Sequence, residues 1–191
     1  MYSYSSLLCD ARFHNLLLAF DRDLAAAARE AGCGLCGGAL HCARYWRKPR
    51  GRACPVGPEH DQRFSFCCAV DGCRRRATPP SLRFLGRKVY IATVVVLVSM
   101  MQHGVTESRV RRLAADVGVD RRTVARWRIW WREVFTASGF WQAARASFMP
   151  PVDDAGLPAT LIARFAGDGV EPLQALLRFI SPVTAGWSHA R

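Results

Sequence analysis

The sequence lacks any long apolar run. Its longest, VYIATVVVLVSMM at residues 89–101, has 13 residues, or about 20 Å as a helix, whereas the apolar core of a bilayer is about 30 Å thick. We therefore interpret this run as a buried helix. The start of the chain also lacks the basic residues, apolar stretch and small-residue cleavage site of a secretory signal. We expect no membrane partner and a cytoplasmic location.

Lysine is nearly missing, since 25 of the 27 basic residues are arginine. Codon bias in a GC-rich genome produces such a balance, so the net charge of +12 does not by itself indicate a function. The distribution of this charge along the chain is more informative than its total. Residues 44–88 carry a charge of +9 and residues 107–136 carry +4, while the other segments carry −1 or zero. This localisation favours a polyanionic partner, because each neutralised phosphate releases counterions.

Internal repeats and low-complexity tracts are also missing, and 191 residues suffice for one ordinary domain or two small ones. Apolar residues at helical spacing predict a first helix over residues 10–31, which Gly32 ends. The pattern is helical again over residues 82–136. Two further helices are predicted near residues 158–166 and 171–180.

Residues 32–80 are rich in Cys, Gly, Pro and Arg, as in a small strand-and-loop module. In the cytoplasm, the eight cysteines of the chain favour metal binding over disulfides. Cys33 and Cys36 form a Cys-x2-Cys pair, and Gly37 and Gly38 allow the tight turn that such a pair needs. Zinc takes four such thiolates in a tetrahedron.

The second cysteine pair comes from the stretch FSFCCAVDGC, where Cys73 is one member and Cys67 or Cys68 is the other. Alternate side chains of a strand point to opposite faces, and Cys68 shares its face with the two phenylalanines. We therefore choose Cys68 and predict a Zn²⁺ site. The predicted ligands are Cys33, Cys36, Cys68 and Cys73.

This zinc is expected to be structural, because four thiolates close the coordination shell and leave no open position for water. Cys9, Cys42 and Cys54 are expected not to be ligands. Cys54 and His41 remain possible substitutes if the second pair is assigned wrongly.

Between the two cysteine pairs lies ARYWRKPRGRACP, in which basic residues alternate with Tyr45 and Trp46. Such a loop can grip phosphates and pack an aromatic ring on a sugar or base. The alternative is a solvated, charged loop without a ligand. The predicted DNA contacts here are Arg47, Lys48 and Arg50, with Arg44 and Arg52 in the same stretch.

The stretch LAADVGVDRRTVARW is typical of a helix-turn-helix. Ala114 supplies the small residue that the first helix needs where the second crosses it, and Gly118 supplies the turn. Asp120 is a suitable N-cap for the second helix. Val124 and Trp127 are expected to be buried.

At 100° per residue, the second helix has an apolar side made of Val124, Trp127, Trp131 and Val134. The opposite side is predicted to enter the major groove, where an arginine can donate two hydrogen bonds to guanine. That side consists of Arg122, Ala125 and Arg126, with Arg121 at its margin. Further along, Arg128 and Arg132 are expected to meet phosphate. Residues 83–102 would form the first helix of this three-helix unit.

The stretches CGLCGG and RFSFCCAVDGCRRR are similar to the zinc ribbon of bacterial insertion-sequence transposases, and LAADVGVDRRTVARWRIWW resembles their helix-turn-helix. The resemblance covers roughly residues 32–136 and implies recognition of element ends. In that family a separate RNase H-like domain with three carboxylates cuts and joins DNA. Here only residues 137–191 follow, and they lack the strands that should carry such acids. The resemblance therefore implies recognition without the cutting chemistry. The acids of that segment are Asp153, Asp154, Asp168 and Glu171.

Together these features predict a mostly α fold with a small β zinc-ribbon module. The predicted segments are an N-terminal helix (1–31), a zinc-ribbon-like module (32–80), a helix-turn-helix domain (81–136) and a helical C-terminal extension (137–191).

The predicted function is sequence-specific binding of double-stranded DNA by a nucleoid-associated accessory, or relic, of a mobile element. A catalytic recombinase or a second copy of the chain would be its partner. One alternative is a transcriptional regulator, and another is a protein-interaction module whose charge is incidental. A third is a small metal-dependent nuclease or transposase, which would need converging carboxylates or an open metal site. The sequence offers neither, so we expect no catalytic residues.

Overall fold

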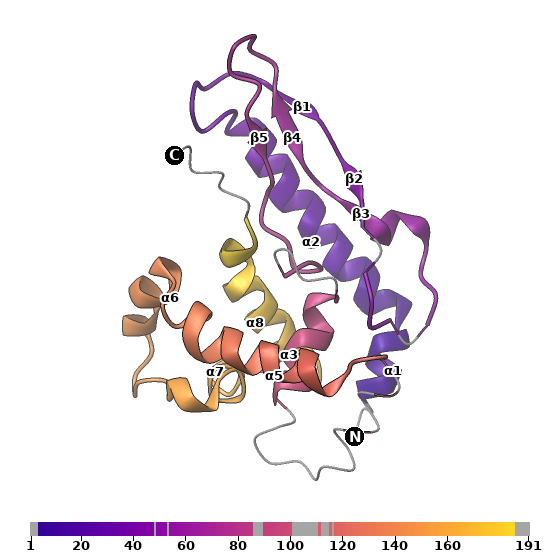
Figure 1. Cartoon of the computed structure of the whole chain (residues 1–191), viewed down its shortest axis with the longest axis vertical. Coiled ribbons are helices and arrows are strands. Elements are labelled where there is room, and N and C mark those ends of the chain that lie inside the picture. The colour runs from indigo at the N-terminus through magenta and orange to yellow at the C-terminus, as the bar shows by residue number, and fades with distance from the viewer. Residues whose placement is uncertain are drawn as a thin grey trace.

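The computed structural model in Figure 1 describes residues 4–47, 49–52, 54–85, 90–100, 111, 115 and 117–185. About half of these residues lie in helices, and the strands form one three-stranded and one two-stranded sheet. This confirms the expected helical chain with a small β part. Within the described residues, no helix is both long and apolar enough to cross a membrane.

The helix predicted over residues 10–31 is confirmed as α2 (Ala11–Glu30). Its N-cap is Asp10, whose carboxylate accepts the N–H of Arg12 at 2.8 Å. The helix ends just before Gly32, as the sequence predicts. The structure adds a short helix, α1 (Tyr4–Cys9), ahead of it.

α2 packs on two hydrophobic cores. Its residues Phe13 and Leu17 belong to the main core of the molecule, which is otherwise built by α1 and by helices of the second half of the chain. Leu18 and Ala25, in contrast, belong to a second, smaller core with residues 33–68. In Figure 1, α2 accordingly runs between the strands and the other helices. One helix therefore joins the two parts of the molecule.

We call residues 32–80 the cysteine module. Within it, residues 40–46 and 62–68 run antiparallel in one continuous register, which we call the ladder. Leu40 pairs with Cys68 at one end and Trp46 pairs with Gln62 at the other. A fifth strand pairs with the far edge of β4. The strands are β1 (Leu40–Cys42), β2 (Tyr45–Trp46), β3 (Gln62–Arg63), β4 (Phe66–Cys68) and β5 (Arg76–Ala77), with the 3₁₀ helix η1 (Pro58–Asp61) before β3.

The prediction of a helix over residues 83–102 is wrong at its start. Helix α3 is Ala92–Met100, and residues 101 and 102 lie outside the described part. Phe84 is instead extended and forms a bridge with Ile91. α3 is apolar on all sides and is buried on all sides, as such a composition requires.

The second half of the chain folds into short helices around an aromatic-rich core. Trp141, Phe148 and Phe179 contact one another there, and α8 packs against α3. The helix predicted near residues 171–180 is present as α8, whereas the one predicted near residues 158–166 is present only in part, as the four-residue α7. The elements are α5 (Arg121–Ile129), the π-helix η3 (Trp130–Phe135), α6 (Gly139–Ala144), η4 (Arg145–Ser147), η5 (Asp154–Gly156), α7 (Ala159–Ile162), α8 (Glu171–Ile180) and η6 (Ser181–Thr184).

The main core joins residues of the predicted segments 1–31, 81–136 and 137–191. Of the C-terminal helices, α8 packs directly on α3, which in turn packs on α5. Whether the four predicted segments act as separate domains stays a prediction.

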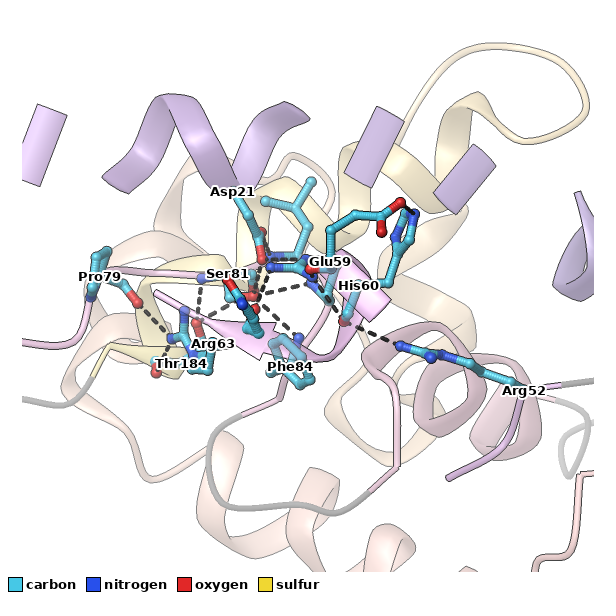
Figure 2. Close-up of polar contacts among 12 residues, drawn as sticks. Asp21, Arg52, Glu59, His60, Arg63, Pro79, Ser81, Phe84 and Thr184 are labelled. Atoms are coloured by element: carbon cyan, nitrogen blue, oxygen red, sulfur yellow. Dashed lines mark hydrogen bonds and ion pairs between the residues drawn. The ribbon is translucent and has the colours of Figure 1, made fainter. Parts of the chain in front are cut away.

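A buried carboxylate connects the two parts of the molecule (Figure 2). Asp21 of α2 is fully buried and accepts a hydrogen bond from the hydroxyl of Ser81. It also accepts the N–H of Leu82 at 2.6 Å and pairs with the guanidinium of Arg83 at 2.8 Å. Residues 82 and 83 form a bend at this point and Phe84 pairs with Ile91, so the predicted helix does not begin here.

Arg83 extends this network into the cysteine module. Its guanidinium donates to the carbonyl oxygens of His60 and Gln62, both at 2.9 Å. A second buried arginine, Arg63, donates to the carbonyl oxygens of Pro79 and Thr184 (Figure 2). Burial lowers the pKa of both guanidinium groups. Two arginines of the basic segment are therefore structural, which the sequence alone does not reveal.

Replacing Asp21 by Asn should lower the free energy of unfolding by about 3–5 kcal/mol, because it leaves the buried charge of Arg83 without its partner. Asp23, which is exposed on the same helix, provides the matched control, and Asp23→Asn should change stability by less than about 0.5 kcal/mol. Urea denaturation of both variants measures the difference. Equal stabilities would contradict this role of Asp21.

One cysteine pair departs from the expectation of metal binding. Cys9, at the end of α1, forms a disulfide with Cys54 across a separation of 45 residues. The bond links α1 to the stretch of the cysteine module that precedes η1. The expectation that neither cysteine is a metal ligand agrees with this finding. The expectation that cysteines serve metal rather than disulfides is wrong for this pair.

Two buried histidines, His14 and His60, lie side by side with their ring centroids 6.2 Å apart. The His14 Nε2–H donates to the carbonyl oxygen of Leu8 at 2.9 Å. Burial holds the pKa of both imidazoles below the ordinary value, since it disfavours the charged form. Burial therefore favours the neutral form of both imidazoles in the folded protein.

The free energy of unfolding should consequently fall as the pH drops below about 6.5, because the unfolded chain then takes up protons that the folded chain does not. His14→Gln should reduce this slope. His41→Gln, at an exposed position, should leave it unchanged. Denaturation curves between about pH 7 and pH 5.5 measure both slopes, and identical slopes would argue against the role of His14.

Candidate metal centre and nucleic-acid interface

Four cysteine sulfurs of the cysteine module come together. The Sγ atoms of Cys33, Cys36, Cys68 and Cys73 all lie within 4.8 Å of one another. Two of the separations are 3.5 Å, between Cys36 and Cys68, and 3.8 Å, between Cys33 and Cys73. A zinc–sulfur bond of about 2.3 Å in a tetrahedron places sulfurs about 3.8 Å apart. The cluster can therefore hold a metal ion, and the four predicted ligands are the residues that form it.

The local backbone brings the sulfurs together. The turn after Cys33 closes through two hydrogen bonds, from the N–H of Cys33 to the carbonyl oxygen of Gly38 and from the N–H of Gly37 to that of Cys33. A Cβ atom at Gly38 would clash with a methyl group of Val70 and lie 3.3 Å from the sulfurs of both Cys36 and Cys68. Glycine therefore fits this position, where the two halves of the cluster and Val70 meet.

The choice between Cys67 and Cys68 is settled by the ladder. Cys68 pairs with Leu40 and is fully buried at the cluster. Cys67 lies on the opposite face, where its thiol donates to the carbonyl oxygen of Arg74 at 3.3 Å. The proposed substitute His41 pairs with Cys67 and is exposed. Neither it nor Cys54 belongs to the cluster.

The thiols differ in acidity. The pKa of Cys33 is lowered to about 6, because backbone N–H groups of Leu35 and Cys36 donate to its sulfur. The pKa of Cys68 is raised to about 12: the N–H of Val70 acts to lower it, but burial and the neighbouring thiols outweigh that effect. One sulfur thus ionises readily while another holds its proton. A divalent cation would draw the protons from the remaining thiols, since ligation requires thiolates.

The second candidate site begins at the turn before α5. Gly118 has a φ of 65°, in the region that favours glycine, and its carbonyl oxygen accepts the hydroxyl of Tyr90 at 2.8 Å. Asp120 caps α5 as predicted, because its carboxylate accepts the N–H of Thr123 at 2.7 Å. This bond also lowers the pKa of Asp120. Ala114, predicted on the preceding helix, lies outside the described residues.

One side of α5 is buried, and the other is exposed. Val124 and Trp127 are buried in the main core, as predicted. The Arg126 guanidinium donates to the hydroxyl of Thr123 at 2.8 Å, which orients it along the outer face. The side chain of Arg121 lies outside the described part. The predicted DNA contacts that are exposed on this helix and its continuation are Arg122, Ala125, Arg126, Arg128 and Arg132.

The apolar side predicted for this helix is wrong at Val134, which is 56% exposed. The helix changes from α to π geometry over Trp130–Phe135, and the wider turn shifts the register by about one residue. Phe135 therefore enters the core in place of Val134, while Trp131 is fully buried as predicted.

The basic loop of the cysteine module is only partly available. Arg52 pairs with Asp61 at 2.7 Å and donates to the carbonyl oxygen of His60, so it has a structural role. The Arg47 guanidinium lies over the ring of Phe84. Arg50 is exposed, and Lys48 lies outside the described residues. The sequence pattern does not separate these roles, because the partners of both arginines, His60 and Asp61 for Arg52 and Phe84 for Arg47, lie outside the basic stretch.

Searches of protein-family models, curated proteins and solved structures found no match. Conclusions about function therefore rest on the residues themselves.

Replacing Cys36 by Ser should abolish tight binding of a single metal ion, because one of four thiolates is lost. Cobalt(II) titration measures this, since the thiolate-to-metal absorption bands report the number of sulfur ligands. Cys42→Ser is the matched control, because Cys42 is an exposed free cysteine outside the cluster. The ligand assignment would be rejected if Cys36→Ser kept the full tetrathiolate spectrum.

Proposed function

We propose that the chain is a zinc-stabilised, sequence-specific DNA-binding protein with a zinc-ribbon module and a helix-turn-helix, and that it recognises DNA without cutting it. The observation that carries this proposal is the exposed arginine face of α5. That face begins directly after the Gly118 turn, and on the opposite side of the helix Val124 and Trp127 are packed in the main core. Its N-terminal end presents Arg122, Ala125 and Arg126. Two long donors beside a small residue suit close approach to base edges.

Zinc is the metal that fits the cluster best. Four thiolates are soft ligands, which zinc accepts in tetrahedral geometry, and a closed shell of four suits a structural ion. The ion would tie the turn at Cys33 to the end of β4 at Cys68, in a module that shares its small core with α2. The chemistry that it supplies is cross-linking of the fold, with no open position for a reacting water.

The acids of the C-terminal extension have local structural contacts, which supports recognition without catalysis. Asp153 caps the following turn through the N–H of Ala155 at 3.0 Å. Asp154 accepts the indole N–H of Trp141 at 3.1 Å and pairs with Arg145 at 3.2 Å. In a mobile-element setting, a recombinase or a second copy would supply any cleavage, and the protein would lie with the nucleoid DNA.

The proposal is tested by selecting duplexes from a random-sequence pool with the purified protein. Arg122→Ala and Arg126→Ala should each lower the preference for the selected site over a scrambled duplex by about 1–3 kcal/mol, since each removes contacts to a base. Arg128→Ala and Arg132→Ala should instead weaken binding to both duplexes and reduce the salt dependence.

Fluorescence anisotropy at several salt concentrations measures all four variants. Unchanged selectivity in both Arg122→Ala and Arg126→Ala would reject the groove assignment. Affinity that hardly changes with salt would point to a protein-interaction module instead, because phosphate contacts give a steep salt dependence.

A further inference from the structure

One large aromatic side chain of the cysteine module is exposed to solvent. Trp46 is 63% exposed and is the only exposed Trp, Tyr or Phe among the side chains that the structure describes. It lies on β2, at the end of the ladder farthest from the cysteine cluster, and pairs with Gln62. Strand pairing fixes its backbone, so the indole is presented from a rigid element.

A guanidinium lies on the same face of the ladder. Side chains two apart on a strand share a face, so Arg44 and Trp46 alternate with Tyr45. In the continuous register Arg44 falls opposite Phe64, and its guanidinium lies 4.9 Å from the centre of that ring. Tyr45, on the other face, lies beneath the guanidinium of Arg76. The register therefore places Arg44 and Trp46 at alternate positions on one face of the ladder, and the Arg44 guanidinium is held over Phe64.

The charges around this face favour an anion. Residues 44–52 contain no acidic side chain. Of the nearby acids, Asp61 is paired with Arg52, while Glu59 is half exposed beside His60. Arg50 adds an exposed positive charge in the same stretch. A ligand that combines a flat ring with a negative charge meets both features of the site.

We propose that Trp46 and Arg44 form a binding site for an unpaired nucleotide of single-stranded DNA. The base stacks on the indole and the phosphate binds the guanidinium, as on stacking platforms that do not require a particular base. A base inside a duplex cannot offer its face in this way. With α5 reading a duplex, the protein would recognise a junction between duplex and single strand. This last step rests on the proposed function, whereas the stacking site does not.

The test uses oligothymidylate and a blunt duplex as probes, with the intact zinc-loaded chain. Trp46→Ala should weaken binding of oligothymidylate roughly tenfold or more and change binding of the blunt duplex less than twofold. Trp46→Phe should keep much of the affinity for oligothymidylate, because a ring remains for stacking. It should also remove the quenching of tryptophan fluorescence by this probe.

Met149→Ala is the matched control, since it truncates another exposed apolar side chain, outside the basic module. Zinc content and thermal unfolding establish that each variant is folded. The proposal is overturned if Trp46→Ala binds oligothymidylate as tightly as the unaltered chain, or if it loses both probes equally. Failure of the α5 variants to affect duplex selectivity would reject the proposed function and leave the stacking result standing.

Discussion

The ion pair between Asp21 and Arg83 is the interaction on which the arrangement of the molecule depends. Asp21 is the only buried carboxylate among the described residues, and it sits midway along the helix that both cores share. Its oxygens bind the segment Ser81–Arg83, and the guanidinium of Arg83 donates in turn to the carbonyl oxygens of His60 and Gln62. A charge buried this deeply tolerates only one geometry. The orientation of the cysteine module on α2 is therefore set by a polar contact as well as by the apolar surface of Leu18 and Ala25.

Arginine has two distinct roles in this chain. Arg63 and Arg83 are buried, and they bind backbone carbonyl groups and aromatic rings, which a planar guanidinium can do with several donors at once. Arg122 and Arg126 are exposed on a helix face. Part of the positive charge of residues 44–88 is thus buried inside the fold. Net charge therefore overstates the surface that a polyanion can reach, and burial has to be known before a basic segment is assigned to a partner.

Short-range patterns were sufficient to predict α2, the Asp120 cap and the four clustered cysteines, because each depends on residues within a turn or on alternation along one strand. The predictions that are wrong depend on contacts that are distant in sequence or on local irregularity. The helix predicted from residue 83 begins only at Ala92, since Phe84 pairs with Ile91 before it, and Val134 is exposed because the helix has π geometry over Trp130–Phe135. The Cys9–Cys54 pairing has no spacing that would reveal it, since 45 residues separate the two.

The continuous ladder has a mechanical consequence for the cysteine cluster. Strand pairing repeats every two residues, so a slip by a single residue would turn every side chain to the opposite face. Such a slip would turn the strand of residues 62–68 relative to the strand of residues 40–46, so that Cys68 would leave the other sulfurs and Cys67 would take its place. An ion bound by all four sulfurs therefore locks the alignment of the hairpin as well as its turn. Metallation at one end of the ladder would thereby fix which side chains of the partner strand share a face with the Trp46 ring at the other.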